Sequence, residues 1–150
     1  FVDNWEYYPL TQNEIDFVFN DLVLAADPRL IKIIVHEDDI VGFILGFPDV
    51  SEGLQRANGQ LFPFGIFHLL LDMRRTKWIC LNGVGIVPEY QGLGGNALLY
   101  SEMAKTVTGE LGFIHAELTQ VAESAVQMRH DLVNLGAKPY KNHRVYIREL

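Results

Sequence analysis

Hydrophobic positions along the chain follow two spacings, one typical of amphipathic helices and one typical of strands. Spacing of three and four residues predicts a helix that begins at the capping pair Thr11 and Glu14 and ends before Pro28, because the residue before a proline resists the helical region. Two runs rich in β-branched residues, 30–35 and 40–47, lie on either side of an acidic turn. They predict an antiparallel hairpin.

The later part of the chain alternates between the two spacings. The predicted elements are, in order, a short helix over 51–57, a strand over 78–87, a helix over 96–108, a strand over 113–118, a helix over 124–135 and a strand over 140–148. Strands and helices that alternate after an antiparallel hairpin predict an α/β fold of the α+β kind, with a mixed sheet flanked by helices. At 150 residues, we expect one domain over 1–150.

Residues 61–71 form the most hydrophobic segment of the chain. The sequence favours a core helix entered through the proline turn at Pro63. Two alternatives are a wall of an acceptor or acyl pocket and an oligomer contact. The segment is too short to span a bilayer, so no membrane span is predicted. The basic run at 74–77 that follows is predicted to be a solvated turn.

A glycine-rich turn, Gln91 to Asn96, lies between the predicted strand at 78–87 and the helix that follows. Three glycines in four residues are unfavourable unless the backbone needs a positive φ or a ligand must approach it closely. Free N–H groups at the start of a helix, together with the helix dipole, favour an anion, and phosphate is the usual one. The turn therefore predicts a phosphate-binding site.

The string Val87-Pro88-Glu89-Tyr90-Gln91-Gly92-Leu93-Gly94 resembles the signature of the GNAT superfamily of acyl-CoA-dependent N-acyltransferases. The resemblance implies a mostly antiparallel sheet with one splayed parallel pair, and a turn that holds the pyrophosphate of acetyl-CoA or another acyl-CoA. Asn96 departs from the family, which usually has Gly or Ala there. The cofactor-binding residues that it implies are Ile86, Val87, Gln91, Gly92, Leu93, Gly94, Gly95 and Asn96. More narrowly, the sequence is similar to the C-terminal part of larger bacterial GNAT-like proteins. The stretches that carry this similarity are 48–54, 59–65, 83–92 and 136–146.

Catalytic residues are less clearly marked than the turn. Glu117 lies midway along the predicted strand at 113–118, beside the strand at 78–87 that is expected to hold the thioester. It is the candidate general base, and a purely structural carboxylate is the alternative. The family's helix often carries a tyrosine acid and an asparagine at positions that are Leu132 and Ala125 here. Tyr140 is the candidate replacement for the acid. No histidine, cysteine or carboxylate spacing predicts a metal site.

The predicted activity is transfer of an acyl group, acetyl being the first candidate, from coenzyme A to an amine of a small molecule or peptide. One alternative is an acyl-CoA-binding or scaffold domain that has lost catalysis, because the expected acid is missing. A second is a dinucleotide-binding domain, since Gly92 to Ala97 fits G-x-G-x-x-A and Glu117 follows by 20 residues.

Charge and cysteine content bear on the partners and the cellular compartment of the protein. A net charge of −7 argues against general nucleic-acid binding. Cys80 is the only cysteine, which excludes an internal disulfide and favours a reducing, cytoplasmic location. The chain opens on Phe1 instead of methionine, so we expect an N-terminal piece to be missing. A homodimer contact or a contact with that piece is the expected protein partner.

Overall fold

The computed structural model describes residues 9–58, 60, 62, 64–144 and 146–148, and within them the side chains of all but 21–25. Its internal contacts divide the chain into two compact units, Phe1–Thr119 and Gln120–Leu150. The sheet and most helices belong to the first unit, and one helix belongs to the second. None of the described helices is long and apolar enough to cross a membrane.

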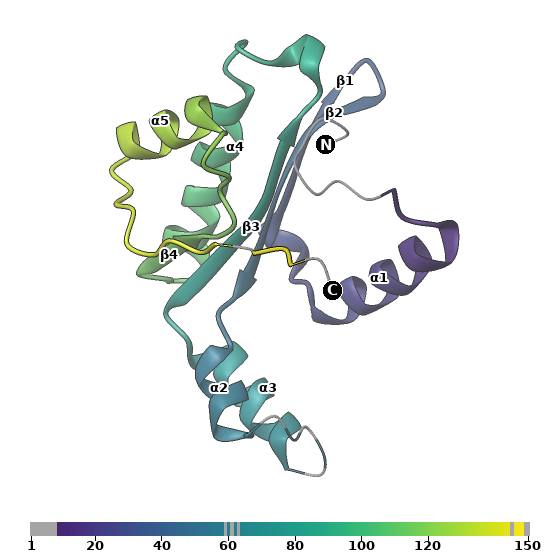
Figure 1. Cartoon of the computed structure of the whole chain (residues 1–150), viewed down its shortest axis with the longest axis vertical. Coiled ribbons are helices and arrows are strands. Elements are labelled where there is room, and N and C mark those ends of the chain that lie inside the picture. Colours follow the sequence, from purple (N-terminus) through teal and green to yellow (C-terminus); the bar gives the residue numbers. More distant parts are fainter. Residues whose placement is uncertain (1–8, 59, 61, 63, 145, 149–150) are drawn as a thin grey trace. The chain divides into compact units, whose positions relative to one another are not determined.

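One four-stranded sheet organises the first unit, in the order β1-β2-β3-β4 (Figure 1). The strands are β1 (Ile31–His36), β2 (Asp39–Pro48), β3 (Trp78–Ile86) and β4 (His115–Leu118). Strand β2 pairs antiparallel with both β1 and β3, whereas β3 and β4 run parallel. This confirms the predicted mixed sheet, and it differs from the doubly wound parallel sheet that the dinucleotide alternative requires.

The hairpin between β1 and β2 turns at Glu37 and Asp38, whose φ angles are 49° and 76°. Two consecutive residues with positive φ form the tight turn whose twist matches that of a hairpin. The predicted hairpin is confirmed, with Ile31 paired to Leu45 and His36 to Asp39.

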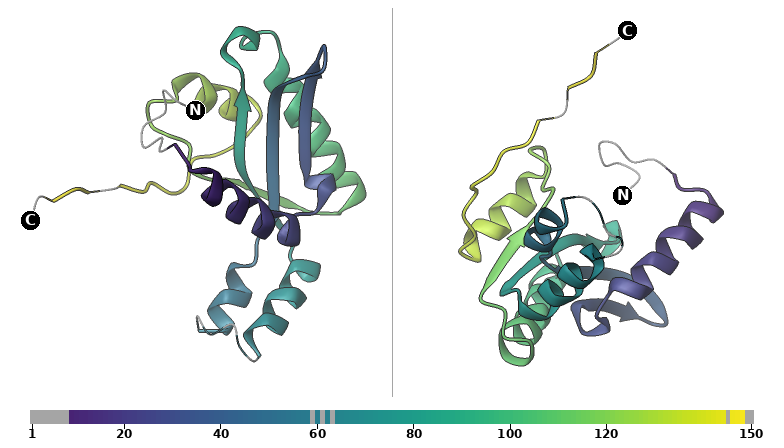
Figure 2. Two further views of the ribbon diagram at one scale, coloured as in Figure 1. Left: turned by 90° about the vertical axis from the view of Figure 1, so that its right-hand side faces the viewer. Right: turned by 90° about the horizontal axis from the view of Figure 1, so that it is seen from below.

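The helices lie between and after these strands. They are α1 (Gln12–Ala25), α2 (Ser51–Arg56), α3 (Gly65–Arg75), α4 (Gly95–Ala104) and α5 (Val126–Asn134), with short helical turns η1 (Pro28–Leu30) and η2 (Pro88–Tyr90) and a wider turn η3 (Lys105–Glu110). Helix α4 covers one face of the sheet (Figure 2). The core of the first unit lies between this helix and the sheet, and its buried residues are Leu30, Ile44, Ile79, Leu99, Met103 and Val107.

Two predictions from the hydrophobic pattern were wrong. The segment at 61–71 is not a core helix, because helix α3 begins only at Gly65 and most of its large apolar side chains are exposed, with Leu69 half-buried; Leu61 and Pro63 lie outside the described residues. The strand predicted over 140–148 is also absent from the described part of that segment, which has no regular structure. Its alternating pattern needs a neighbouring strand, and local sequence does not supply one.

Asp27 anchors the entry into β1. Its carboxylate accepts hydrogen bonds from the Arg29 backbone N–H at 3.0 Å and from the Arg29 guanidinium, with 2.7 Å between Nη2 and Oδ2. The hydrogen bond from the Arg29 side chain, as the largest cause, lowers the pKa of Asp27 below its ordinary value. Asp27 therefore stabilises the fold above the unfolded pKa of about 3.9, and this contribution is lost as the pH falls through the lower folded pKa.

We expect Asp27→Asn to lower the free energy of unfolding at pH 7 by at most about 1 kcal/mol, since both partners are partly exposed. The variant keeps a capping oxygen but no charge. The difference between wild type and variant should shrink as the pH falls below about 4. Urea unfolding at pH 7 and pH 3 measures it, and an equal difference at both pH values would contradict the assignment.

Candidate functional site

The splayed pair of strands is present at β3 and β4. The two strands pair only over Trp78–Leu81 and His115–Leu118, and the last bond runs from the Thr119 N–H to the Leu81 oxygen at 3.2 Å. Beyond Leu81, β3 continues to Ile86, and among the described residues β2 is its only strand neighbour there (Figure 1). Half of β3 therefore has one edge open within the first unit.

The register identifies which N–H groups face this open edge. The Val87 N–H donates to the Val41 oxygen of β2 at 2.9 Å, so it points away from the edge. Because polar groups alternate in direction along a strand, Ile86 and Val84 direct theirs to the open side. A role in cofactor binding through the backbone N–H therefore fits Ile86 and not Val87. Val84 has the same orientation as Ile86, which the sequence alone does not reveal because it depends on the pairing with β2.

A bulge marks the point where the two strands separate. The register of β2 and β3 shifts between Ile44 and Gly46, and Gly83 opposite it has a φ of 142°. Such a φ is open to glycine but rare for other residues. Bulges re-aim the backbone and often lie beside active sites. Here the bulge follows directly on the last residues that β3 shares with β4.

The glycine-rich turn lies at the far end of the open edge. Gly92 and Gly94 have φ angles of 77° and 88°, and a Cβ added at either would have no atom within 4 Å. Gly95 has a different role, because a Cβ there would lie 2.7 Å from Cδ1 of Ile86. Two glycines therefore give the turn its shape and leave open space in front of it, and the third lets α4 pack on β3.

Unbonded N–H groups line this open space. The first helical bond of α4 runs from the Leu98 N–H to the Gly94 oxygen at 3.1 Å. For the N–H groups of residues 92–97, no hydrogen-bond acceptor is found in the described parts of the chain. These donors lie at the positive end of the helix dipole, so the turn fits a phosphate-bearing ligand.

Two side chains tie the turn to the strands of the sheet. Gln91 Nε2 donates to the Ile86 oxygen at 3.1 Å, which ties the turn to the end of β3. The Tyr90 hydroxyl lies 3.2 Å from Nδ1 of His36 on β1, and the two rings are 5.3 Å apart. An apolar groove of about 390 Å³ lies between the turn, β1 and α4. The Gln91 side chain thus holds the turn in position.

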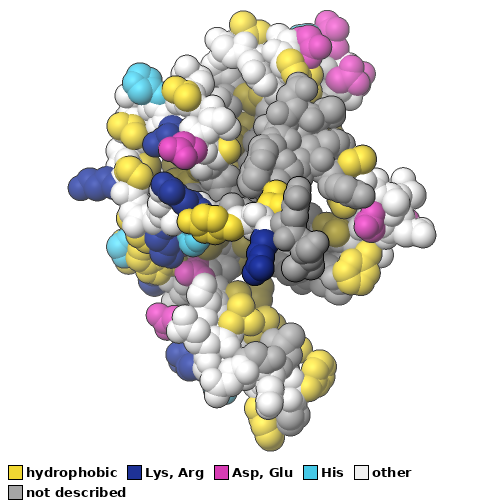
Figure 3. All heavy atoms as spheres, in the orientation of Figure 1, with side chains coloured by type: hydrophobic (Ala, Val, Ile, Leu, Met, Phe, Trp, Pro, Cys, Tyr) yellow, Lys and Arg dark blue, Asp and Glu magenta, His cyan; other side chains and the backbone are white. Residues whose placement is uncertain are grey.

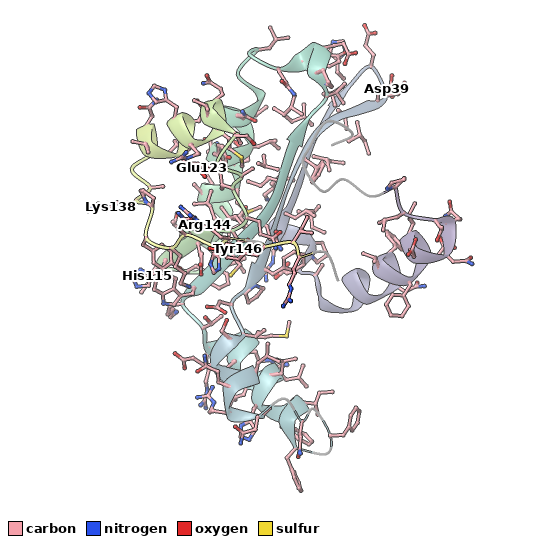
Figure 4. The ribbon with its side chains drawn as sticks, in the orientation of Figure 1. Asp39, His115, Glu123, Lys138, Arg144 and Tyr146 are labelled. Carbon is pink, nitrogen blue, oxygen red and sulfur yellow. The ribbon has the colours of Figure 1, made fainter. Side chains whose placement is uncertain are left out.

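Glu117 lies on β4 opposite Cys80, half-buried and just before the strands separate. Gly83 at the bulge is three residues further along β3 than Cys80, about 10 Å along an extended strand. The side chains of Trp78 and His115 share this face and stack with ring centroids 4.3 Å apart. His115 is labelled in Figure 4. The structure therefore places Glu117 beside the point of separation but not on the open edge.

The remaining predicted positions lie in the second unit. Tyr140 is 62% exposed, with Lys141 Nζ 4.8 Å from its ring centroid, and its role as an acid stays a prediction. Leu132 on α5 is buried. In the described part of the chain, no group of three or more histidine, cysteine or carboxylate side chains is placed to hold a metal ion.

Comparison with protein families and curated proteins gave distant relatives. No family model matches the chain. Protein YghO of Escherichia coli (strain K12) is 28% identical over 152 residues, which cover 98% of this chain and 39% of that protein. The bacterial ceramide synthase of Caulobacter vibrioides is 28% identical over 153 residues, covering 99% and 40%. The chain thus spans about two fifths of the length of these relatives.

Solved structures show the fold. An aminoglycoside acetyltransferase from an uncultured soil metagenomic sample, in complex with trehalose, matches with a TM-score of 0.59 and 10% identity, covering 99% of this chain and 81% of that one. The aminoglycoside N-acetyltransferase AAC(6')-Iy in complex with CoA matches with a TM-score of 0.57 and 14% identity, covering 91% and 88%. The chain has the fold of the GNAT acetyltransferases.

Proposed function

We propose that this protein transfers an acyl group from coenzyme A to an amine. The observation that carries the proposal is the row of unbonded N–H groups at residues 92–97, which comes after the open edge of β3 and is separated from it by the short turn η2. An extended ligand with phosphates at one end and amide groups along its arm would satisfy both. Acyl-CoA has this combination of groups.

The open edge suits the arm of such a ligand. The N–H groups of Val84 and Ile86 would bond the amide oxygens of the arm, as a neighbouring strand would. The phosphates would lie at the turn around Gly92 and Gly94, where no side chain stands in the way. The acyl end would then reach the bulge at Gly83, where the two strands separate.

At the bulge, the amine nitrogen would attack the thioester carbonyl carbon and form the carbon–nitrogen bond. The carbon–sulfur bond would break, coenzyme A would leave as its thiolate, and the amine would lose a proton. A backbone N–H near the bulge would stabilise the negative charge that develops on the carbonyl oxygen. Glu117 would accept the proton. Because it lies about 10 Å along the strand from Gly83, we assign it this role through a bridging water.

The comparisons support an amine as the acceptor. Both structural neighbours are aminoglycoside acetyltransferases, and one is in complex with CoA. A curated relative is a ceramide synthase, and a ceramide is an amide between a fatty acid and an amino alcohol. These names share an acyl donor and an amine, and they differ in acyl length. We therefore propose acetyl-CoA or a longer acyl-CoA as donor.

The test is turnover with a matrix of donors and acceptors. Acetyl-, octanoyl- and palmitoyl-CoA would each be mixed with a polyamine, an aminoglycoside, a peptide and a long-chain amino alcohol. Thiol release and mass spectrometry of the amide product would report the reaction. Binding of coenzyme A by calorimetry without any turnover would favour the acyl-CoA-binding alternative. Lack of binding at millimolar coenzyme A would overturn the proposal.

A further inference from the structure

The hairpin of α2 and α3, which connects β2 to β3, exposes an unusual amount of apolar surface. Its large hydrophobic side chains lie outward over the tip and along α3, and hydrophobic side chains are visible at the surface over this hairpin in Figure 3. They are Leu54 (45% exposed), Phe62 (79%), Phe64 (72%), Ile66 (37%), Phe67 (66%), Leu70 (53%) and Leu71 (43%). This patch is called the hairpin patch below.

Small and polar groups occupy the inside of the same hairpin. The buried residues of α2 and α3 are Gly53, Gly65 and Asp72. Asp72 pairs with Arg56, and a Cβ added to Gly53 would lie 2.8 Å from Oδ2 of Asp72. The two helices thus pack through glycine and an ion pair, and most of their large apolar side chains are exposed. Large exposed apolar patches mark sites that bind a protein or a membrane.

Charge is distributed around the patch in a way that selects a partner. From Ala57 to Leu71 the sequence has no acidic, lysine or arginine residue, and Arg74, Arg75 and Lys77 follow. Residues 51–77 carry four basic side chains against two acidic ones, whereas the rest of the chain carries eight against 17. Among the described residues, no ion pair is found for Arg74 or Arg75.

We propose that the hairpin patch docks on an anionic phospholipid surface. The aromatic tip would enter the boundary between head groups and acyl chains, and Arg74 and Arg75 would contact the phosphates. An apolar helix face with neighbouring basic residues binds anionic bilayers in this way, through buried apolar area and charge attraction. A lipid surface also requires no pocket of matching shape. This docking is independent of whether the protein transfers acyl groups.

The experiment is co-sedimentation of the whole protein with vesicles, either of phosphatidylcholine alone or of phosphatidylcholine with 30% phosphatidylglycerol. We expect binding to the anionic vesicles, and weaker binding when salt is raised. Phe64→Ser with Phe67→Ser should weaken this binding about tenfold or more, because two phenyl rings leave the interface. Arg74→Glu with Arg75→Glu should weaken it by about tenfold.

Phe17→Ser with Phe19→Ser is the matched control, because these α1 side chains are 69% and 61% exposed but lie outside the hairpin. This control should bind like the wild type, and circular dichroism should show that all variants are folded. Absence of wild-type binding, or equal loss in patch and control variants, would overturn the proposal. So would a wild-type dimer in analytical ultracentrifugation that Phe64→Ser with Phe67→Ser dissociates, since the patch would then contact a second copy.

Discussion

Replacing Gly94 with valine is expected to abolish measurable binding of coenzyme A. Gly94 has a φ of 88°, which valine rarely adopts, and its missing Cβ leaves open space in front of the turn. The valine side chain would fill the space that a pyrophosphate needs, and the altered backbone would redirect the N–H groups of residues 92–97. We expect affinity to fall by a factor on the order of a hundred or more, as for loss of several charge-assisted hydrogen bonds. Calorimetric titration measures it.

Gly136→Val provides the matched control. Gly136 follows α5, has a φ of 89°, and would also have no atom within 4 Å of an added Cβ. This variant introduces the same backbone strain outside the proposed site, so it should lose stability but bind coenzyme A like the wild type. Binding by Gly94→Val at wild-type affinity, with its fold confirmed by circular dichroism, would remove the turn from the site.

Glu117→Gln is expected to lower kcat by a factor on the order of a hundred, once an acceptor has been identified. Glutamine keeps the shape of the side chain but cannot accept the amine proton. Because Glu117 lies on β4 and not at the glycine turn, the affinity for coenzyme A should stay unchanged. Steady-state kinetics measures kcat, and calorimetry measures the affinity for coenzyme A.

His115→Gln is a useful comparison for this variant, because His115 lies two residues before Glu117 on the same face of β4. It stacks on Trp78 and has no assigned role in proton transfer. It should therefore keep kcat within a few-fold. If Glu117→Gln behaves like His115→Gln, Glu117 is a structural carboxylate and the proton leaves by another route.

The glycine-rich turn could be predicted from sequence because its chemistry is local. Three glycines at 92, 94 and 95 have few uses other than positive φ or close approach, and the structure shows one or the other at each. The β1–β2 hairpin was predictable for the same reason, since acidic turn residues between two β-branched runs specify a tight turn. The role of Glu117 is not of this kind, and it stays a prediction.

The sequence by itself therefore determined most of the elements, the mixed sheet that their order implies and the position of the glycine-rich turn, because these follow from local patterns along the chain. Only the tertiary structure decided which backbone N–H groups face the open edge. That choice between Val84 and Val87 follows from the pairing of β3 with β2 and from the bulge at Gly83. The sequence also left the exposure of α3 undetermined. A hydrophobic helix has the same sequence pattern whether it packs in a core or lies at the surface, and only the tertiary packing distinguishes the two.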